Sequence, residues 1–265
     1  MKRLRQKDDD LVQGTDDVSP LLLYLQGTLS LEQVSIDKLR LGTNWKTIFI
    51  HPSGNASLKF IDLLSEADAQ FLFDEANQLP FEEYPPIVMF GKPARMRRSI
   101  VFLAVPGVKG YSYANQTSKA HPLTPTLQRF MALINAICGA SFNGILVNKY
   151  NGMHDYISPH SDDEAGLSPD VGVVAVSLGA ERTMNFVEKR APHTKHNVVM
   201  TDGSALCMFG SQFQKKYTHG IRAGKDSMQV PASTFFQSAP VKKQAMVRAT
   251  VRISLTFRCH RVATL

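Results

Sequence analysis

Two stretches of the chain repeat apolar residues at the three- and four-residue spacing of an amphipathic helix. The first begins with a capping box at Ser65 and extends to Leu79, immediately before a proline. The second runs from Pro125 to Cys138, and Gly139 ends it. We therefore expect two helices that each bury one face, as helices packed against a sheet do.

The chain changes to short β-type runs after Gly139. These runs are rich in β-branched and aromatic residues, and they cover 145–150, 171–179, 182–188, 197–200 and 205–210. A last run, 248–258, alternates, so that one face is apolar and the other carries Arg252, Ser254, Thr256 and Arg258. Strands spaced this closely predict a mainly β fold with flanking helices, a sandwich or jelly roll, rather than alternating βαβ units.

Composition narrows the class of protein. With 43% hydrophobic residues in 265, the chain can bury a full core, which excludes global disorder. Its three cysteines are too few for a disulfide framework, so we expect a reduced, intracellular protein. The first residues lack the apolar run of a signal peptide, and no stretch approaches the roughly 18 apolar residues of a membrane span. We therefore expect a soluble protein without membrane contact.

Positive charge is concentrated in the C-terminal part of the chain. From Lys189 to Arg261 there are 13 lysines and arginines and 2 acidic residues, whereas residues 1–188 carry 17 basic and 21 acidic residues. This asymmetry favours a polyanionic partner such as nucleic acid. It fits a solvated face without a ligand equally well.

One group of residues has the pattern of a metal site. His160 and Asp162 flank a single residue, so on an extended segment both side chains project to the same side. With His219 they would form the two-histidine, one-carboxylate triad of non-haem Fe(II) oxygenases, which leaves positions open for cosubstrate and oxygen. The alternative is a histidine that only hydrogen-bonds to a nearby aspartate in a loop.

Two arginines add to this pattern. Arg252 and Arg258 lie on the same face of the last run, where two guanidinium groups suit a dicarboxylate. The alternative is a solvated outer strand face that happens to carry them.

Taken together, several motifs between Met89 and Arg258 resemble the AlkB family of nucleobase dioxygenases. Asn148–Tyr150 followed by His160–Glu164 is similar to the family's Asn-x-Tyr and His-x-Asp block. Ser177–Ala180 with Arg182 and Phe186 resembles its Ser-hydrophobic-Gly, Arg and Phe strands. Arg252–Arg258 is similar to its Arg-x-Asn-Leu-Thr-Phe-Arg ending.

The resemblance implies a cofactor, two cosubstrates and a set of residues for them. His160, Asp162 and His219 would bind Fe(II), and O₂ would react there. The residues that would hold 2-oxoglutarate are Asn148, Tyr150, Arg252, Ser254, Thr256 and Arg258. The implied architecture is a flexible extension over 1–45, a helix and nucleotide-recognition lid over 46–125, and a double-stranded β-helix (jelly-roll) core over 126–265.

The resemblance also implies residues that meet the substrate base. Phe90 would wedge into the base stack from a hairpin, although a buried core phenylalanine fits equally well. Arg97 or Arg98 would occupy the lid, and Tyr111 and Tyr113 would stack on the flipped base. The acidic pair Asp163 and Glu164 would lie beside that base, or would form a solvated acidic loop.

The chain departs from the family pattern at two places. Ser254 replaces the usual asparagine, which shortens or removes one polar contact to the cosubstrate. An insertion over 223–245 separates His219 from Arg252, and we expect a surface loop there.

The implied function is oxidative demethylation of N-alkylated bases, with release of formaldehyde, succinate and CO₂. The partner would be nucleic acid, with DNA favoured over RNA, and we expect a monomer in the nucleus or cytoplasm. Two alternatives belong to other classes: a nucleic-acid-binding jelly-roll module without turnover, and a 2-oxoglutarate oxygenase that acts on protein or lipid.

Overall fold

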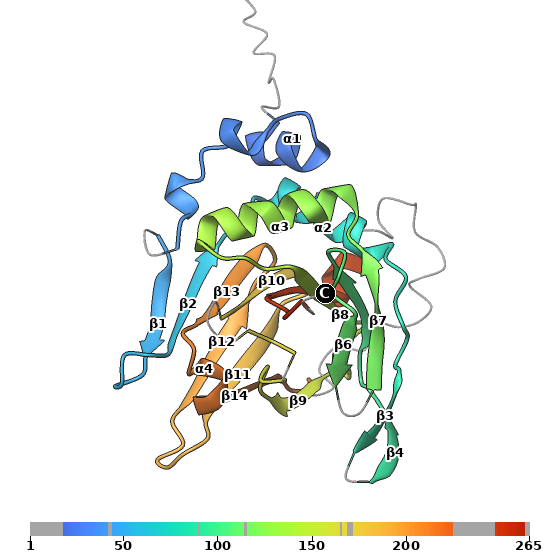
Figure 1. The fold of residues 1–265 in the computed structure, drawn as a ribbon, viewed down its shortest axis with the longest axis vertical. Coiled ribbons are helices and arrows are strands. Elements are labelled where there is room, and N and C mark those ends of the chain that lie inside the picture. Colours follow the sequence, from blue (N-terminus) through green and yellow to red (C-terminus); the bar gives the residue numbers. More distant parts are fainter. Residues whose placement is uncertain are drawn as a thin grey trace, which may run out of the picture.

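Two facing β-sheets form the centre of the computed structural model, which describes residues 18–41, 44–89, 91–113, 116–164, 166–168, 172–224 and 247–262. The larger sheet has nine strands and the smaller has four, and a separate two-stranded hairpin projects from one end (Figure 1). This arrangement confirms the predicted mainly β fold with a jelly-roll core and flanking helices. Among the described residues, no helix is long and apolar enough to cross a membrane.

The larger sheet brings together strands from both ends of the chain. In spatial order its strands are β1 (Lys46–Ile50), β2 (Ser57–Asp62), β13 (Ser204–Phe209), β10 (Val173–Gly179), β15 (Arg252–Arg258), β8 (Gly144–Tyr150), β5 (Ser99–Ala104), β7 (Gln116–Pro122) and β6 (Gly110–Tyr113). Neighbouring strands are antiparallel except β5 and β7. Segments 46–125 and 126–265, which the resemblance assigns to a lid and to the core, both contribute strands to this sheet.

The smaller sheet covers the inner face of the larger one. Its antiparallel strands are β12 (Lys195–Met200), β11 (Arg182–Glu188), β14 (Tyr217–Ile221) and β9 (Ile157–His160), and the short helix α4 (Phe213–Lys216) precedes β14. Apolar side chains from the two sheets and from α4, among them Leu206, Phe186 and Phe213, form a shared core. The remaining hairpin joins β3 (Pro86–Met89) to β4 (Lys92–Arg95).

Both predicted helices are present on the outer face of the larger sheet (Figure 1). Helix α2 (Glu66–Asn77) begins with the predicted capping box at Ser65, and α3 (Pro125–Cys138) ends at Gly139 in a left-handed conformation. Their apolar faces and the outward-facing side chains of the sheet form a second large core.

The structure corrects the expectation of a flexible extension over 1–45. Residues 1–17 lie outside the described part, but Pro20–Gln26 forms helix α1, followed by the short turns η1 (Leu31–Gln33) and η2 (Asp37–Leu39). Leu25 of α1 is fully buried, and the Tyr24 hydroxyl donates to the Arg129 carbonyl of α3 at 2.9 Å. The extension is held because its apolar residues recur at helical spacing and pack on α3.

The last strand, β15, begins at Arg252 rather than at Arg248. The preceding residues close a helical turn, in which the Val251 amide donates to the Val247 carbonyl at 2.8 Å. Both faces of β15 are buried. Its apolar residues face the helices and its polar residues face the smaller sheet, which is why a solvated outer face is wrong for Arg252 and Arg258.

Candidate active site

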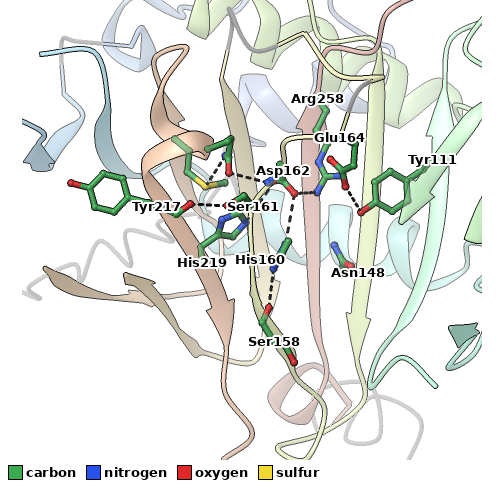
Figure 2. A network of polar contacts seen from close by, with 12 residues as sticks. Tyr111, Asn148, Ser158, His160, Ser161, Asp162, Glu164, Tyr217, His219 and Arg258 are labelled. Carbon is green, nitrogen blue, oxygen red and sulfur yellow. Dashed lines mark hydrogen bonds and ion pairs between the residues drawn. The ribbon is translucent and has the colours of Figure 1, made fainter. Parts of the chain in front are cut away.

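The cavity between the two sheets contains the predicted metal-binding group. β9 and β14 are paired so that His160 lies directly opposite His219, and Asp162 follows two residues after the end of β9 (Figure 2). One possible ligand atom from each of the three residues lies within 4.8 Å of the others. Sequence positions 59 residues apart therefore meet because two antiparallel strands are neighbours in the smaller sheet.

The three side chains are close and buried. The Nε2 atoms of His160 and His219 each lie 3.7 Å from a different carboxylate oxygen of Asp162. The two imidazole rings are 4.4 Å apart between centroids. Asp162 and His219 are 4% and 5% exposed, so a cation held here would be largely screened from water.

Neighbouring groups orient the histidines and the carboxylate. Nδ1 of His160 lies 3.0 Å from the Ser158 carbonyl, which places the ring proton there and leaves the Nε2 lone pair facing the cavity (Figure 2). The Asp162 amide donates to Oε1 of Gln214 at 3.0 Å. The His219 ring stacks on Phe186, with 6.0 Å between centroids and 26° between planes.

Burial and charge put the triad in the protonation state that a metal requires. Burial lowers the pKa of His160 to about 3, together with repulsion from His219. Burial also lowers the pKa of His219. Burial raises the pKa of Asp162, but Arg258 and the two histidines outweigh it, so the pKa is lower than usual. At neutral pH the site has two neutral imidazoles and one carboxylate.

This donor set fits Fe(II). Two imidazole nitrogens and one carboxylate are the facial triad of non-haem iron sites. Oδ2 of Asp162 and Nδ1 of His219 are buried and have no hydrogen-bond partner among the described residues. A buried carboxylate oxygen without a partner is costly, and a cation between the three residues would remove that cost at Oδ2.

The two arginines of β15 are both buried and contact different neighbours. Nη2 of Arg258 donates to Oδ1 of Asp162 at 2.5 Å, and Arg258 is 2% exposed. Arg252 is 1% exposed, and its Nε donates to the Ser177 hydroxyl at 3.1 Å. Within the described part of the chain, Nη1 and Nη2 of Arg252 have no hydrogen-bond partner.

The surroundings of Arg252 fit an anionic cosubstrate. Burial lowers the pKa of this guanidinium to about 10; Tyr150 opposes this shift, and the charge of Arg182 adds to it. A buried guanidinium fork with free donors is suited to a carboxylate that binds with two hydrogen bonds. 2-Oxoglutarate has such a carboxylate, so the residues present fit this ligand.

The other residues predicted for the cosubstrate lie around the same cavity. Asn148 and Tyr150 of β8 and Ser254 and Thr256 of β15 line it, together with the triad and Arg258. The Arg252 guanidinium lies 5.3 Å from the centre of the Tyr150 ring. Oδ1 of Asn148 accepts a hydrogen bond from Nε of Arg98 at 2.7 Å.

The structure separates the residues predicted for the base. Arg98 lines the cavity and is buried, whereas Arg97 is exposed. Tyr111 is 3% exposed, and its hydroxyl donates to Oε1 of Glu164 at 3.2 Å (Figure 2). Asp163 points away, with a side chain 55% exposed that pairs with Lys189 at 3.6 Å.

Two predicted substrate residues are not tested by this geometry. Phe90 lies outside the described residues. Tyr113 belongs to β6, but its side chain is outside the described part. Most of the insertion over 223–245 is also outside it.

Sequence patterns missed two residues that support the site. Gln214 contacts the Asp162 amide from α4, and no motif marks it. Ser158 orients His160 through a backbone carbonyl, a role that any residue type can fill. The one signal in the sequence was that Gln214 lies five residues before His219, which only weakly indicates a place near the triad.

The chain belongs to the 2OG-Fe(II) oxygenase superfamily, whose family model matches residues 59–258. Fe(II), 2-oxoglutarate and O₂, the cofactor and cosubstrates expected from the sequence, are those of this superfamily.

Curated relatives confirm the resemblance to AlkB proteins. The chain is 30% identical over 156 residues to the DNA oxidative demethylase ALKBH2 of Homo sapiens, which covers 56% of the chain and 51% of the relative. It is 27% identical over 210 residues to the Mus musculus protein of the same name, covering 76% of the chain and 79% of the relative. The chain thus spans about half the length of the human relative.

A solved structure shows the same fold. The structure of OsALKBH1 superposes with a TM-score of 0.53 at 16% identity, and the match covers 81% of the chain and all of that structure.

Proposed function

We propose that this protein removes alkyl groups oxidatively from the ring nitrogens of nucleic-acid bases, with DNA as the preferred substrate. The observation that carries the proposal is the buried triad of His160, Asp162 and His219, together with the buried Arg252 of β15, whose Nη1 and Nη2 have no hydrogen-bond partner among the described residues. The relatives named as DNA oxidative demethylases support the choice of DNA.

The residues of the chain have separate roles in this reaction. His160, Asp162 and His219 would hold Fe(II), and Arg252 would hold the dicarboxylate from the larger sheet. When bound, iron would supply oxidising chemistry with O₂ and 2-oxoglutarate, in which the cosubstrate becomes succinate and CO₂ and a methyl group is oxidised and leaves as formaldehyde. The two sheets exclude water around the triad, which strengthens each of these electrostatic contacts.

Tyr111, which lines the cavity, and its partner Glu164 suit a methylated base. Burial raises the pKa of Glu164, and its contact with Tyr111 holds the carboxyl group in place. An alkylated ring nitrogen makes the base cationic, and an aromatic ring and an acidic group favour a cation. The base would have to leave the duplex to reach this depth.

The proposal is tested by mass spectrometry of methylated oligonucleotides after incubation with Fe(II) and 2-oxoglutarate. We expect loss of the methyl group from DNA, and faster loss from DNA than from RNA of the same sequence. Asp162→Ala should abolish it, whereas His154→Ala, at an exposed histidine near the triad in sequence, should not. Succinate formation that persists in Asp162→Ala would contradict the metal assignment.

A nucleic-acid-binding module without turnover is the second candidate. The basic C-terminal part of the chain favours it, because such charge binds phosphate whether or not catalysis follows. Titration with Co(II) and 2-oxoglutarate separates the two, since a module without turnover takes up neither. We further propose that the protein acts as a monomer in the nucleus or cytoplasm, where its free cysteines and Fe(II) stay reduced.

A further inference from the structure

The turn between β8 and β9 joins the predicted cosubstrate strand to the strand that carries His160. This turn, residues 151–156, contains Asp155, which is 7% exposed. One carboxylate oxygen of Asp155, Oδ2, accepts two hydrogen bonds: from the Asn151 amide at 2.7 Å and from the Tyr84 hydroxyl at 3.1 Å. A buried carboxylate with two converging donors fixes the conformation of the turn.

The same turn is tied to the strand that carries His219. Nη2 of Arg182 donates to the Asp155 carbonyl at 2.8 Å and to the Arg222 carbonyl at 2.6 Å. Nη1 of Arg182 donates to the Gly152 carbonyl at 3.1 Å. Arg222 directly follows β14, so one buried guanidinium connects the entry to β9 with the exit from β14. These are the two strands on which His160 and His219 lie opposite each other.

Asp155 also connects the turn between β8 and β9 to the β3–β4 hairpin. Tyr84 comes just before β3, and its carbonyl accepts a hydrogen bond from Nη1 of Arg95 in β4 at 3.2 Å. Tyr84 has a φ of 46°, a left-handed conformation that non-glycine residues adopt at a cost and keep only when their surroundings hold them. Its hydroxyl receives a further hydrogen bond from Nδ2 of Asn151 at 3.2 Å.

We propose that Asp155 is a positioning residue that sets the spacing of the two histidine strands and couples that spacing, through Tyr84, to the β3–β4 hairpin. It touches neither metal nor substrate and acts through the turn. The hairpin part of the proposal rests on the proposed function, because it assumes that the hairpin meets nucleic acid. The expected effect of Asp155 on metal binding does not depend on the proposed function.

The first test measures metal affinity without turnover. Co(II) is titrated into the protein with 2-oxoglutarate present, and binding is followed by visible absorption. Asp155→Ala should weaken Co(II) binding roughly tenfold, as is usual when groups that orient metal ligands are removed. Asp155→Asn keeps one oxygen that can accept both hydrogen bonds and should restore the affinity.

The matched control is another buried aspartate, at a place remote from the site. Asp68 is 2% exposed and accepts hydrogen bonds from Ser65 and Ser19 at the start of α2. Asp68→Ala should lower the unfolding temperature and leave Co(II) affinity unchanged. Unchanged Co(II) affinity in a folded Asp155→Ala would overturn the proposal. If Asp155→Ala does not fold, Arg182→Lys takes its place, because a lysine cannot reach all three carbonyls. Unchanged Co(II) affinity in Arg182→Lys would then overturn the proposal.

The second test isolates the hairpin with Tyr84→Phe, which removes a hydroxyl and leaves the bond between Asp155 and Asn151 in place. We expect a KM for methylated DNA that rises several-fold, with Co(II) affinity and the KM for 2-oxoglutarate unchanged. An unchanged KM for DNA would refute the coupling. If the wild-type protein removes no methyl group, the proposed function fails, while the Co(II) titrations still decide the role of Asp155.

Discussion

Replacing Arg252 by methionine should separate the binding of 2-oxoglutarate from the stability of the fold. The buried guanidinium has two donor groups without a partner among the described residues, so it is poorly compensated in the ligand-free protein. Burial lowers its pKa from 12.5 to about 10. At about 1.4 kcal/mol per pKa unit, the buried charge costs the folded protein about 3 kcal/mol.

One contact offsets part of that cost. The hydrogen bond from Nε to Ser177 contributes about 1 kcal/mol, whereas the effect of Tyr150 is already included in the lowered pKa. Arg252→Met should therefore make the ligand-free protein more stable by about 2 kcal/mol, which raises its unfolding temperature by about 4–8 °C.

The same change should remove most of the stabilisation by 2-oxoglutarate. Loss of two charge-assisted hydrogen bonds costs about 3 kcal/mol or more, so binding weakens at least about 100-fold. A concentration 100 times the wild-type Kd stabilises the wild type by about 2.7 kcal/mol and the variant by about 0.4 kcal/mol.

The assay is calorimetric unfolding with Mn(II) in place of Fe(II), with and without 2-oxoglutarate. Arg40→Met, at an exposed arginine with a 56% exposed side chain, is the control and should change neither quantity. The reasoning is refuted if Arg252→Met destabilises the ligand-free protein strongly while 2-oxoglutarate still raises its unfolding temperature as in the wild type.

Three further predictions follow from the neighbours of the site. Gln214→Ala removes the acceptor of the Asp162 amide and should weaken Co(II) binding roughly tenfold by absorption titration, while Gln214→Glu keeps the acceptor and should not. Phe186→Ala empties a fully buried position beneath His219 and should cost about 3–5 kcal/mol in urea unfolding. His260 is buried, and its pKa is lowered to about 4, mainly by burial. As the pH falls, His260 therefore takes up a proton at a higher pH in the unfolded chain than in the folded protein. Between pH 7.5 and about pH 5.5 the wild type should therefore lose about 1 kcal/mol more stability than His260→Phe.

Each of these predictions has a contrary result. Equal Co(II) affinity in the alanine and glutamate variants at Gln214 would show that its contact does not orient Asp162. A Phe186→Ala protein as stable as the wild type would mean that the smaller sheet collapses around the gap. An identical pH dependence in the wild type and His260→Phe would show that this histidine titrates normally.

Local patterns predicted two of the helices and six of the strands, and they indicated candidate residues for the site. The helix over Pro125–Cys138 has the same bounds in the structure, because a proline start, an apolar stripe and a terminal glycine act within the segment itself. Strict alternation likewise placed the polar residues of β15 on one face. The His-x-Asp spacing and the arginine spacing in turn brought the candidate ligands to notice.

The sequence alone could not determine contacts between distant segments. It indicated that Arg252 and Arg258 share a face, but only the packing of β15 between the helices and the smaller sheet made that face an interior one. The sequence predicted only an extension over 1–45. A helix as short as α1 is stable only when it packs on another element, here α3, and the sequence does not show that contact. The hydrogen bonds that join Asp155, Tyr84 and Arg182 link two loops to the start of β11, segments that are distant in the chain, so tertiary structure alone decided them.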